Sequence, residues 1–461
     1  MQSSFFKIKE NYQLDLKKEK IKVENLDYQA ALAFIHGRTQ FKKIPTLERM
    51  RDFCERLGNP QKKLKMIHIT GTNGKGSTTA FTRQLLMEKG FKVGTFTSPF
   101  IIKFNDRICI NGEMISDEKL VKLVAKIKPI VAQMDQDWEN HGGGPTEFEI
   151  DTAIMFEYFV EENVDYAVIE VGLGGTYDST NIISPLVTVI TNVGTDHLKY
   201  LGPTIKDVAR NKAGIIKDEV PVIVGQIDDK TANVEIMQTA QTMQAPVFQI
   251  NHEIQVQKQQ TSKWGECFKY RFKDYCFNKL ELSLMGDYQI SNAALALTAV
   301  LELGAREGWE FQKNEINHAL QKTNWPGRFE KVNESPLIVL DGAHNIQAMD
   351  QLVTLLQQRF KEYKIYIILS ILADKQPDEM ISKLLSLKNV EVTLTKFNSP
   401  RPITNLKEIH AKFPQVNIND QWQNVLVQTV QKMDSNDMIL FAGSLYFISE
   451  VRGYFTTQEE D

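Results

Sequence analysis

A glycine-rich stretch connects an apolar run to a helical pattern in residues 66–86, MIHITGTNGKGSTTAFTRQLL. Glycines let a backbone approach phosphate oxygens closely, and the first turn of a helix offers free N–H groups to an anion. Lys75 adds a positive charge, and Ser77 could cap an N–H group or reach a metal ion. The stretch departs from the common G-x-x-x-x-G-K-S/T pattern, because Ile69 replaces the first glycine and Gly76 follows the lysine directly. We interpret it as a nucleotide phosphate loop, with an ordinary glycine-rich turn as the alternative.

Other polar residues follow apolar runs that are typical of buried strands. Glu170 ends the run DYAVIE, and a carboxylate at the tip of a parallel strand lies where α/β sheets bind ligands. Beside a phosphate loop this position predicts a Mg²⁺ ligand, and a surface glutamate is the alternative. Taken alone, Asp196 and His197 are typical of a core or helix-capping pair, and DGAHN (341–345) of a polar strand-to-helix turn.

The elements that must position these residues alternate along the chain. Short β-rich runs predict strands at residues 65–70, 92–98, 165–172, 186–193 and 221–225. Apolar spacings of three and four predict helices at residues 28–38, 46–58, 77–90, 116–134, 146–163, 204–217 and 287–304. This alternation indicates an α/β protein with a largely parallel sheet. Residues 250–285 instead alternate like antiparallel strands.

A second α/β pattern begins after the stretch WPGR, residues 325–328, which contains the proline and glycine typical of a linker. Strands are expected beyond it at residues 336–343, 364–372, 390–397 and 437–444. We predict an N-terminal P-loop ATPase-like domain with a mostly parallel sheet over residues 1–324. A smaller Rossmann-like α/β domain is expected over residues 329–461.

Composition excludes several classes of protein. The net charge of −4 gives no bulk basicity, so neither nucleic acid nor an acidic membrane surface is an expected partner. The four cysteines show neither zinc-ligand nor disulfide spacing, which predicts reduced thiols. The N-terminus lacks the apolar core of a signal peptide, and the longest apolar stretch, MILFAGSLYFI, is too short to span a bilayer and is expected to be a buried strand. We therefore expect a cytoplasmic protein.

Several motifs together resemble a known family. GTNGKGST resembles the variant phosphate loop of the Mur ligase superfamily, and the surrounding motifs are similar to those of the folylpolyglutamate synthase family. These motifs are TSPFIIKFNDRICING (97–112), TEFEIDTA (146–153), VIEVGLGGTYDSTNII (168–183), KAGIIK (212–217), GDYQISNA (286–293), WPGRFEK (325–331), DGAHN (341–345) and AGSLYF (442–447). They occur in the family's order and span about residues 30 to 450.

The resemblance implies a set of site residues. It implies that ATP is bound by Thr72, Asn73, Gly74, Lys75, Gly76, Ser77, Asn292, Arg328 and Asp341. It implies that Mg²⁺, as two ions, is held by Ser98, Glu170 and His197, and that the catalytic residues are Lys75, Lys212 and His344. Lys212 is implied to be carbamylated, although Asn211 stands where many relatives carry glutamate.

The implied reaction is ATP-dependent amide ligation. Expulsion of oxide from a carboxylate is difficult, so the γ-carboxylate of a folate's terminal glutamate is first phosphorylated. The amine of L-glutamate then displaces phosphate from the acyl phosphate. The loop at 98–107 and residues near 142–149 are expected to grip folate. Phe100 and Phe104 are expected either to stack on its rings or to belong to the core.

Three alternatives remain open from the sequence. The same motifs serve a bifunctional enzyme that also joins glutamate to dihydropteroate. A cell-wall Mur ligase usually carries a further domain before the phosphate loop, whereas only about 65 residues precede it here. A non-catalytic nucleotide-binding regulator would bind ATP without ligating anything. A monomer is expected, because the cleft would be formed within one chain.

Overall fold

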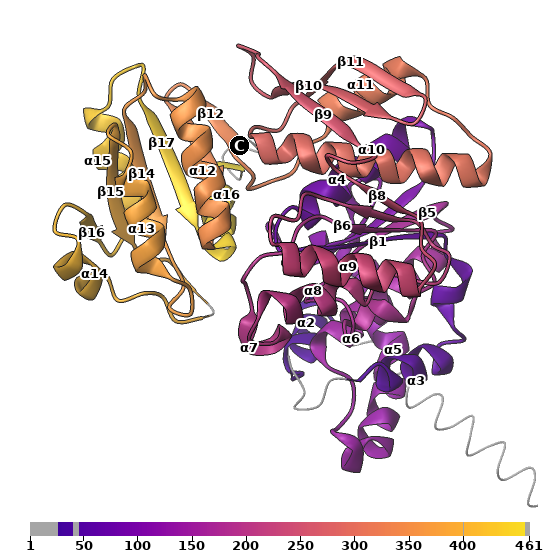
Figure 1. The fold of residues 1–461 in the computed structure, drawn as a ribbon. Coiled ribbons are helices and arrows are strands. Elements are labelled where there is room, and N and C mark those ends of the chain that lie inside the picture. Colours follow the sequence, from indigo (N-terminus) through magenta and orange to yellow (C-terminus); the bar gives the residue numbers. More distant parts are fainter. Residues whose placement is uncertain (1–25, 40–45, 400, 457–461) are drawn as a thin grey trace, which may run out of the picture.

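The computed structural model describes residues 26–39, 46–399 and 401–456 as two lobes, each built on its own large sheet (Figure 1). The N-terminal lobe contains an eight-stranded sheet and a three-stranded sheet, and the C-terminal lobe contains a six-stranded sheet. The predicted α/β class, with a mostly parallel N-terminal sheet and a second C-terminal sheet domain, is confirmed. The proposed boundaries 1–324, 325–328 and 329–461 stay a prediction.

The eight-stranded sheet has the order β4-β3-β2-β5-β1-β6-β7-β8. Its strands are β1 (Met66–Thr70), β2 (Val93–Phe96), β3 (Ile108–Ile110), β4 (Glu113–Met114), β5 (Tyr166–Glu170), β6 (Val187–Ile190), β7 (Val222–Val224) and β8 (Val247–Gln249). Strands β3 and β4 pair antiparallel at one edge, and the others are parallel. In the centre, Ile69 of β1 pairs with Glu170 of β5, so that the tips of these strands adjoin. Both strands are buried along their whole length, as expected for a sheet covered on both faces.

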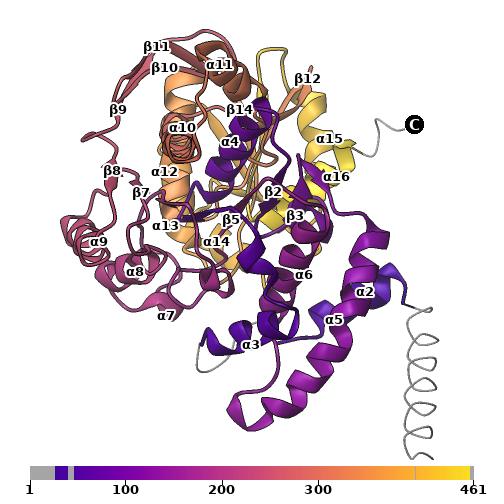
Figure 2. The ribbon, with the colours of Figure 1, turned by 90° about the vertical axis from the view of Figure 1, so that its right-hand side faces the viewer.

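Helices cover both faces of this sheet (Figure 2). Helices α4 and α10 lie between it and the small antiparallel sheet, while α2, α3, α5 and α6 share a core cluster with β1 and β5. The helices are α2 (Tyr28–His36), α3 (Glu48–Arg56), α4 (Lys75–Glu88), α5 (Asp117–Asp137), α6 (Glu147–Glu161), α7 (Leu198–Leu201), α8 (Ile205–Ala213), α9 (Lys230–Thr242), α10 (Asp287–Glu307) and α11 (Lys313–Lys322). The small sheet consists of β9 (Gln255–Gln259), β10 (Glu266–Phe272) and β11 (Tyr275–Leu282). The predicted antiparallel strands within residues 250–285 are therefore confirmed.

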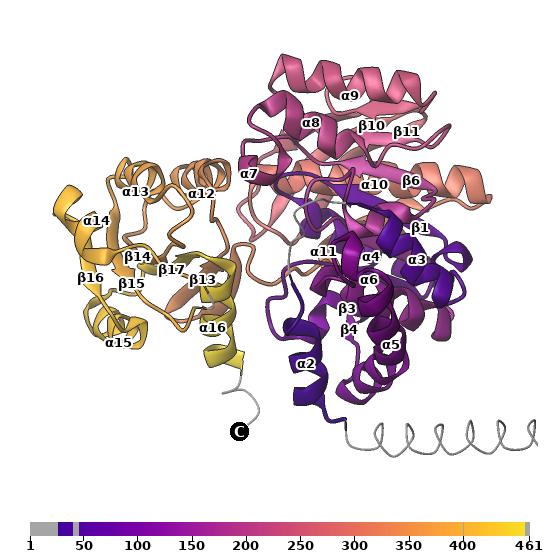
Figure 3. The ribbon, with the colours of Figure 1, turned by 90° about the horizontal axis from the view of Figure 1, so that it is seen from below.

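The C-terminal sheet has the order β12-β13-β17-β14-β15-β16. Its strands are β12 (Glu330–Glu334), β13 (Leu337–Asp341), β14 (Ile365–Ser370), β15 (Val390–Thr395), β16 (Asn417–Asn419) and β17 (Met438–Gly443). Only β12 among these strands pairs antiparallel. Helices α12 (Ile346–Arg359) and α13 (Pro377–Leu385) cover one face, and α15 (Trp422–Lys432) and α16 (Leu445–Thr456) cover the other (Figure 3). A short helix, α14 (Leu406–Lys412), contacts β16.

Three details correct or refine the sequence predictions. The stretch MILFAGSLYFI is not one buried strand, because β17 ends at Gly443 and α16 begins at Leu445. The short strands β3, β4, β8, β12 and β16 were not predicted, since strands of two to five residues carry little periodicity. All four cysteines are free, as expected, and Cys276 is exposed. In the part of the chain that the structure describes, no helix has the length and apolar character needed to cross a bilayer.

Candidate active site

The phosphate loop joins β1 to α4, and its glycines are required by the residues packed against it. Gly74 has a φ of 83°, and a Cβ added there would lie 2.3 Å from Oδ1 of Asn292 on α10. A Cβ on Gly76 would lie 2.8 Å from Cζ2 of Trp325. Both distances are too short for real contacts, so any side chain would displace its neighbour. The unusual glycine pattern therefore follows from the close approach of α10 and of the segment entering the C-terminal lobe.

The loop backbone is held in place by the residues that follow β6. Thr191 Oγ1 and Asn192 Nδ2 donate hydrogen bonds to the Asn73 carbonyl at 2.6 and 3.0 Å. The Asn73 N–H donates to Asn192 Oδ1 at 2.9 Å. The Thr72 N–H donates to the Asn192 carbonyl at 3.2 Å, and Thr72 Oγ1 accepts from the Gly194 N–H at 2.8 Å. The loop is therefore ordered by protein contacts alone, and the N–H groups of the first turn of α4 need no rearrangement to meet an anion.

Lys75 and Glu170 face each other at the tips of the central strands. The Lys75 ammonium donates to the carbonyls of Gly71 and Thr72 at 3.1 and 3.4 Å, and it lies 3.8 Å from Glu170 Oε1. Burial raises the pKa of Glu170 to about 7, against the opposing charges of Lys75 and Arg328. The Ser98 N–H donates to the Glu170 carboxylate. The predicted metal residues Ser98 and Glu170 are therefore adjacent.

Lys212 and His197 lie within electrostatic reach of this group. Lys212, on α8, is 3% exposed, and no hydrogen bond or ion pair reaches its ammonium within the described residues. Burial, and after it the charge of Lys75, holds the pKa of Lys212 well below its ordinary value. Burial also lowers the pKa of His197, although Asp196 opposes the shift. The charges of Lys75 and Lys212 lower that pKa further.

The donor set suits a hard cation in part. Among the residues that the structure describes, no three His, Cys, Asp or Glu side chains gather into a metal-binding cluster. Glu170 and Ser98 nevertheless place a buried carboxylate and a hydroxyl-bearing residue together, and oxygen ligands are those that Mg²⁺ prefers. The imidazole of His197 is a softer ligand, so it is the least typical member of the predicted set.

The C-terminal lobe contributes a second polar group at the tip of β13. Asp341 is buried and accepts hydrogen bonds from the N–H groups of Phe329 and Ala343, both at 2.9 Å. Burial raises the pKa of Asp341 to about 6, and the charge of Arg328 opposes this rise. His344 Nδ1 lies 2.8 Å from the Gly342 carbonyl, and burial lowers the pKa of His344 to about 4. His344 is therefore neutral at pH 7.

The two lobes meet through polar contacts between these groups. Asn345 Nδ2 donates to Asn73 Oδ1 at 3.0 Å and to Asp196 Oδ2 at 3.2 Å. Lys375 Nζ forms an ion pair with Asp196 Oδ1 at 3.1 Å. Burial acts to raise the pKa of Asp196, but His197 and Lys375 outweigh it and lower that pKa to about 2. The phosphate loop and the segment that follows β6 are therefore in direct contact with the C-terminal lobe.

Asn345 and Lys375 were not among the predicted site residues, although both contact the opposite lobe. Lys375 follows β14 as Asn345 follows β13, and polar residues after parallel strands were the available signal. The predicted nucleotide, metal and catalytic residues do gather around one cleft. Phe104 is only 3% exposed, which places it in the core rather than on an open surface. The roles assigned to all of these residues stay predictions.

An arginine–aspartate pair near Phe104 was also missed by the sequence analysis. Arg107 lies with its guanidinium 5.3 Å from the ring centre of Phe100 and 5.7 Å from that of Phe104. Its Nε is 4.0 Å from Asp151 Oδ2 on α6. Burial raises the pKa of Asp151 to about 7, against the charge of Arg107.

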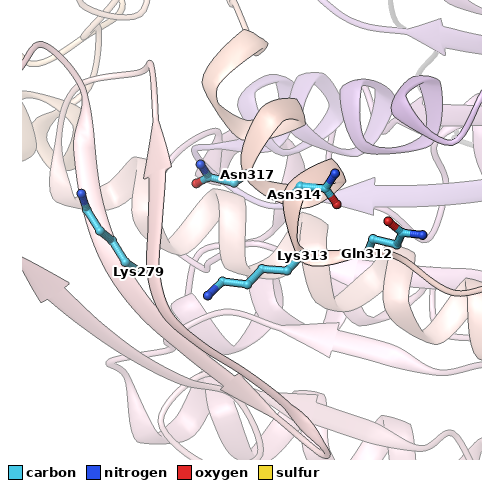
Figure 4. A pocket seen from close by; sticks show the side chains of 5 residues that line it. All are labelled: Lys279, Gln312, Lys313, Asn314 and Asn317. Atoms are coloured by element: carbon cyan, nitrogen blue, oxygen red, sulfur yellow. The ribbon is translucent and has the colours of Figure 1, made fainter.

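An open hollow of about 550 Å³ lies elsewhere, beside β11 and the start of α11 (Figure 4). It is lined by Lys279, Gln312, Lys313, Asn314 and Asn317. None of the predicted site residues lines it.

Comparisons with known proteins agree with this architecture. Residues 69–300 match the Mur ligase middle domain, and residues 327–445 match the Mur ligase glutamate ligase domain. The chain is 39% identical over 428 residues to dihydrofolate synthase/folylpolyglutamate synthase of Bacillus subtilis, covering 92% of this chain and 98% of that protein. It is 36% identical over 429 residues to folylpolyglutamate synthase of Lacticaseibacillus casei, covering 93% of this chain and 98% of that protein.

Solved structures give the same result. The apo form of L. casei FPGS (folylpolyglutamate synthase) superposes with a TM-score of 0.83 at 35% identity, covering 94% of this chain and 100% of that one. An FPGS complex with AMPPCP and folate superposes with a TM-score of 0.82 at 35% identity, covering 93% of this chain and 99% of that one. The two-lobed fold and the cleft at the phosphate loop define a Mur ligase architecture. Within it, the chain belongs to the family of the folylpolyglutamate and dihydrofolate synthases.

Replacing Gly74 with alanine tests the glycine pattern. The new Cβ would collide with Asn292, and the left-handed backbone would cost about 1–2 kcal/mol. We expect Gly74→Ala to weaken ATP binding at least 10-fold, as measured by isothermal titration calorimetry. Gly90→Ala is the matched control, because Gly90 also has a positive φ but faces open space. Equal ATP affinity in the two variants would contradict the packing explanation.

Replacing Asp151 with asparagine tests its buried state. An acid whose pKa is higher in the folded protein than in the unfolded chain loses stabilising effect as the pH rises between the two values. For Asp151 these values are about 7 and an ordinary 3.8. Between pH 5 and pH 8 we expect the wild type to lose roughly 2–3 kcal/mol of unfolding free energy relative to Asp151→Asn in urea titrations. Parallel pH profiles would refute this, and the exposed Asp274→Asn is the control.

Proposed function

We propose that the chain is an ATP-dependent, ADP-forming ligase that adds L-glutamate to the γ-carboxylate of tetrahydrofolate or its polyglutamates. The observation that carries this is the polar contact between the two lobes, where Asn73 of the phosphate loop contacts Asn345 and Asp196 contacts Lys375. A site between two contacting lobes fits a reaction in which ATP, an acceptor and an amino acid must meet away from water. The named relatives, and the FPGS complex with AMPPCP and folate, support the substrates.

The reaction proceeds by phosphorylating the acceptor's γ-carboxylate, since oxide is too poor a leaving group for direct attack by an amine. The acceptor oxygen attacks the γ-phosphorus of ATP and ADP departs, leaving an acyl phosphate. The glutamate amine then attacks the acyl carbon and releases phosphate. The charges of Lys75 and Arg328 both lower the pKa of Glu170, which indicates that both lie near it. Both are therefore suited to stabilise charge on the transferred phosphoryl group.

The other residues position the nucleotide and the acceptor. Residues 72–77 supply N–H groups to the phosphates, with Asn292 and Asp341 toward the nucleoside. Mg²⁺, as two ions, would be held by Ser98, Glu170 and His197 and would supply charge neutralisation on the phosphates. Neutral His344 can donate or accept a single hydrogen bond near the transferred group. The C-terminal lobe would bind L-glutamate.

Lys212 is proposed to be carbamylated. Only a neutral amine attacks CO₂, and burial lowers the pKa of Lys212 and so favours its neutral form. The carbamate would place a negative charge near Lys75 and would favour binding of a metal ion. Asn211, the departure from the family pattern, accepts a hydrogen bond from the Gly175 N–H at 3.0 Å and so fixes the neighbouring loop.

A second activity, joining glutamate to dihydropteroate, is favoured by one observation: the B. subtilis relative carries both names. A cell-wall Mur ligase and a non-catalytic regulator have no comparable support. A monomeric state and a cytoplasmic location stay predictions.

Mass spectrometry of the reaction product tests the proposed function. Incubating the protein with tetrahydrofolate, MgATP and L-glutamate is expected to add glutamyl units stepwise and to release one phosphate for each unit. Glu170→Gln should lower kcat at least 100-fold, because a charge at the phosphoryl site is lost. A parallel incubation with dihydropteroate decides the second activity. An unmodified tetrahydrofolate would refute the proposal.

Carbamylation of Lys212 is tested by carbon-13 NMR in labelled bicarbonate. We expect a carbamate resonance at pH 8 that is absent from Lys212→Arg and weaker at pH 6, where more of the amine is protonated. Lys212→Ala should lose about 100-fold or more in kcat. Lys206→Arg, on the same helix but half-exposed and paired with Glu235, is the control and should keep the resonance. Wild-type protein without the resonance would refute carbamylation.

A further inference from the structure

Arg107 is the last residue of the short 3₁₀ helix η2 (Phe104–Arg107). Its guanidinium lies against aromatic rings and makes no hydrogen bond within the described residues. The rings of Phe100 and Phe104 lie against its guanidinium at 5.3 and 5.7 Å. Within the described residues no hydrogen bond reaches any of its nitrogens, and its Nε is buried without a partner. The side chain keeps 12% exposure, so its terminal nitrogens retain access to the outside. A planar guanidinium with two free terminal nitrogens can bind a carboxylate in a bidentate contact, with two parallel hydrogen bonds.

Asp151 is the nearest charge to Arg107 and is itself unsatisfied. Both of its carboxylate oxygens are buried without a hydrogen bond, and Oδ2 lies 4.0 Å from Arg107 Nε. The other charges around Asp151 are Glu147 and His36, and these pair with each other at 2.9 Å. Asp151 thus fixes the inner edge of Arg107 electrostatically and leaves the outer edge free for a ligand. A buried carboxylate and a partly exposed guanidinium that both lack hydrogen bonds indicate a further partner.

The position of Arg107 indicates which ligand group it faces. The Arg107 carbonyl accepts a hydrogen bond at 2.9 Å from the N–H of Thr97, and the next residue, Ser98, donates its N–H to Glu170, which lies 3.8 Å from Lys75 of the phosphate loop. Arg107 is therefore near the point where the acceptor's γ-carboxylate would be phosphorylated. A terminal glutamyl residue carries a second carboxylate, on its α-carbon, a few bonds away. That anion would otherwise approach the phosphates of ATP without a counter-charge.

We propose that Arg107 binds the α-carboxylate of the acceptor's terminal glutamyl residue and that Asp151 is the positioning residue that orients it. This inference rests on the proposed function and deepens it. Dihydropteroate carries a single carboxylate, which is the one activated, so it offers nothing to this site. Arg107 therefore separates glutamate addition to folates from glutamate addition to dihydropteroate.

The test compares two acceptors in the purified full-length protein. One is tetrahydrofolate, and the other is its analogue with an α-carboxamide in place of the α-carboxylate. The wild type is expected to use the amide roughly 10- to 100-fold less well in kcat/KM, the size of a charged hydrogen-bonded contact. Arg107→Gln should lower kcat/KM for tetrahydrofolate by the same factor and kcat/KM for the amide by less than threefold. The KM values for ATP and L-glutamate should stay within twofold.

Further variants distinguish positioning from folding. Arg107→Lys keeps the positive charge but loses the planar guanidinium that can form two parallel hydrogen bonds. We expect about a 10-fold loss of kcat/KM with tetrahydrofolate and a smaller loss with the amide. Asp151→Asn should show the same selectivity through a raised KM for tetrahydrofolate with kcat nearly unchanged. Arg56→Gln, an exposed arginine paired with Asp52 on α3, is the control and should behave as wild type.

Two results would overturn the inference while leaving the proposed function intact. One is an equal loss by Arg107→Gln with both acceptors, and the other is a rise confined to the KM for L-glutamate. A wild type that glutamylates neither acceptor refutes the proposed function itself.

Discussion

The contact between the phosphate loop and the C-terminal lobe is the constraint on which the site depends. Asn345 bridges Asn73 and Asp196, and Lys375 pairs with Asp196. The predicted site residues are divided along the chain. Lys75, Glu170 and Lys212 belong to the N-terminal lobe, Arg328 to the segment between the lobes, and Asp341 and His344 to the C-terminal lobe. These few polar bonds between the lobes bring the predicted residues together.

Burial explains the charge states of the residues predicted for the site. Glu170, Lys212 and Asp341 are all buried, and burial shifts each pKa toward the neutral form. Asp196 is the exception, because Lys375 and His197 keep it ionised. In such a low-dielectric site, each added charge has a large effect on its neighbours. The arrangement therefore favours a polyanionic ligand with metal ions over an empty cleft.

The glycines of the loop link local backbone to the whole architecture. In the common phosphate loop the glycine positions follow from the approach of phosphate alone. Here Gly74 and Gly76 also make room for Asn292 and Trp325. Asn292 belongs to α10 and Trp325 begins the passage to the second lobe, so the loop packs against parts of the chain that lie more than 200 residues away. The glycine spacing is therefore set by a packing requirement that spans the molecule.

Local sequence determined much of this structure. The apolar periodicity located the long helices and the buried parallel strands, and the glycine-rich stretch with its lysine identified the phosphate loop. The sequence predicts these features because each depends on residues that are close together along the chain. The short strands β3, β4, β8, β12 and β16 escaped prediction, since their residues have too little periodicity and their pairing is set by the neighbouring strands.

Only the tertiary structure decided which polar side chains meet. The chain separates Asp196 from Lys375 by 179 residues, Asn73 from Asn345 by 272 and Arg107 from Asp151 by 44. Nothing in the local sequence of these residues specifies their partners. The same is true of burial, which moves Asp151 and Lys212 far from their ordinary charge states. The physical reason is that electrostatic interactions and desolvation depend on distance in space, whereas a sequence pattern records distance along the chain.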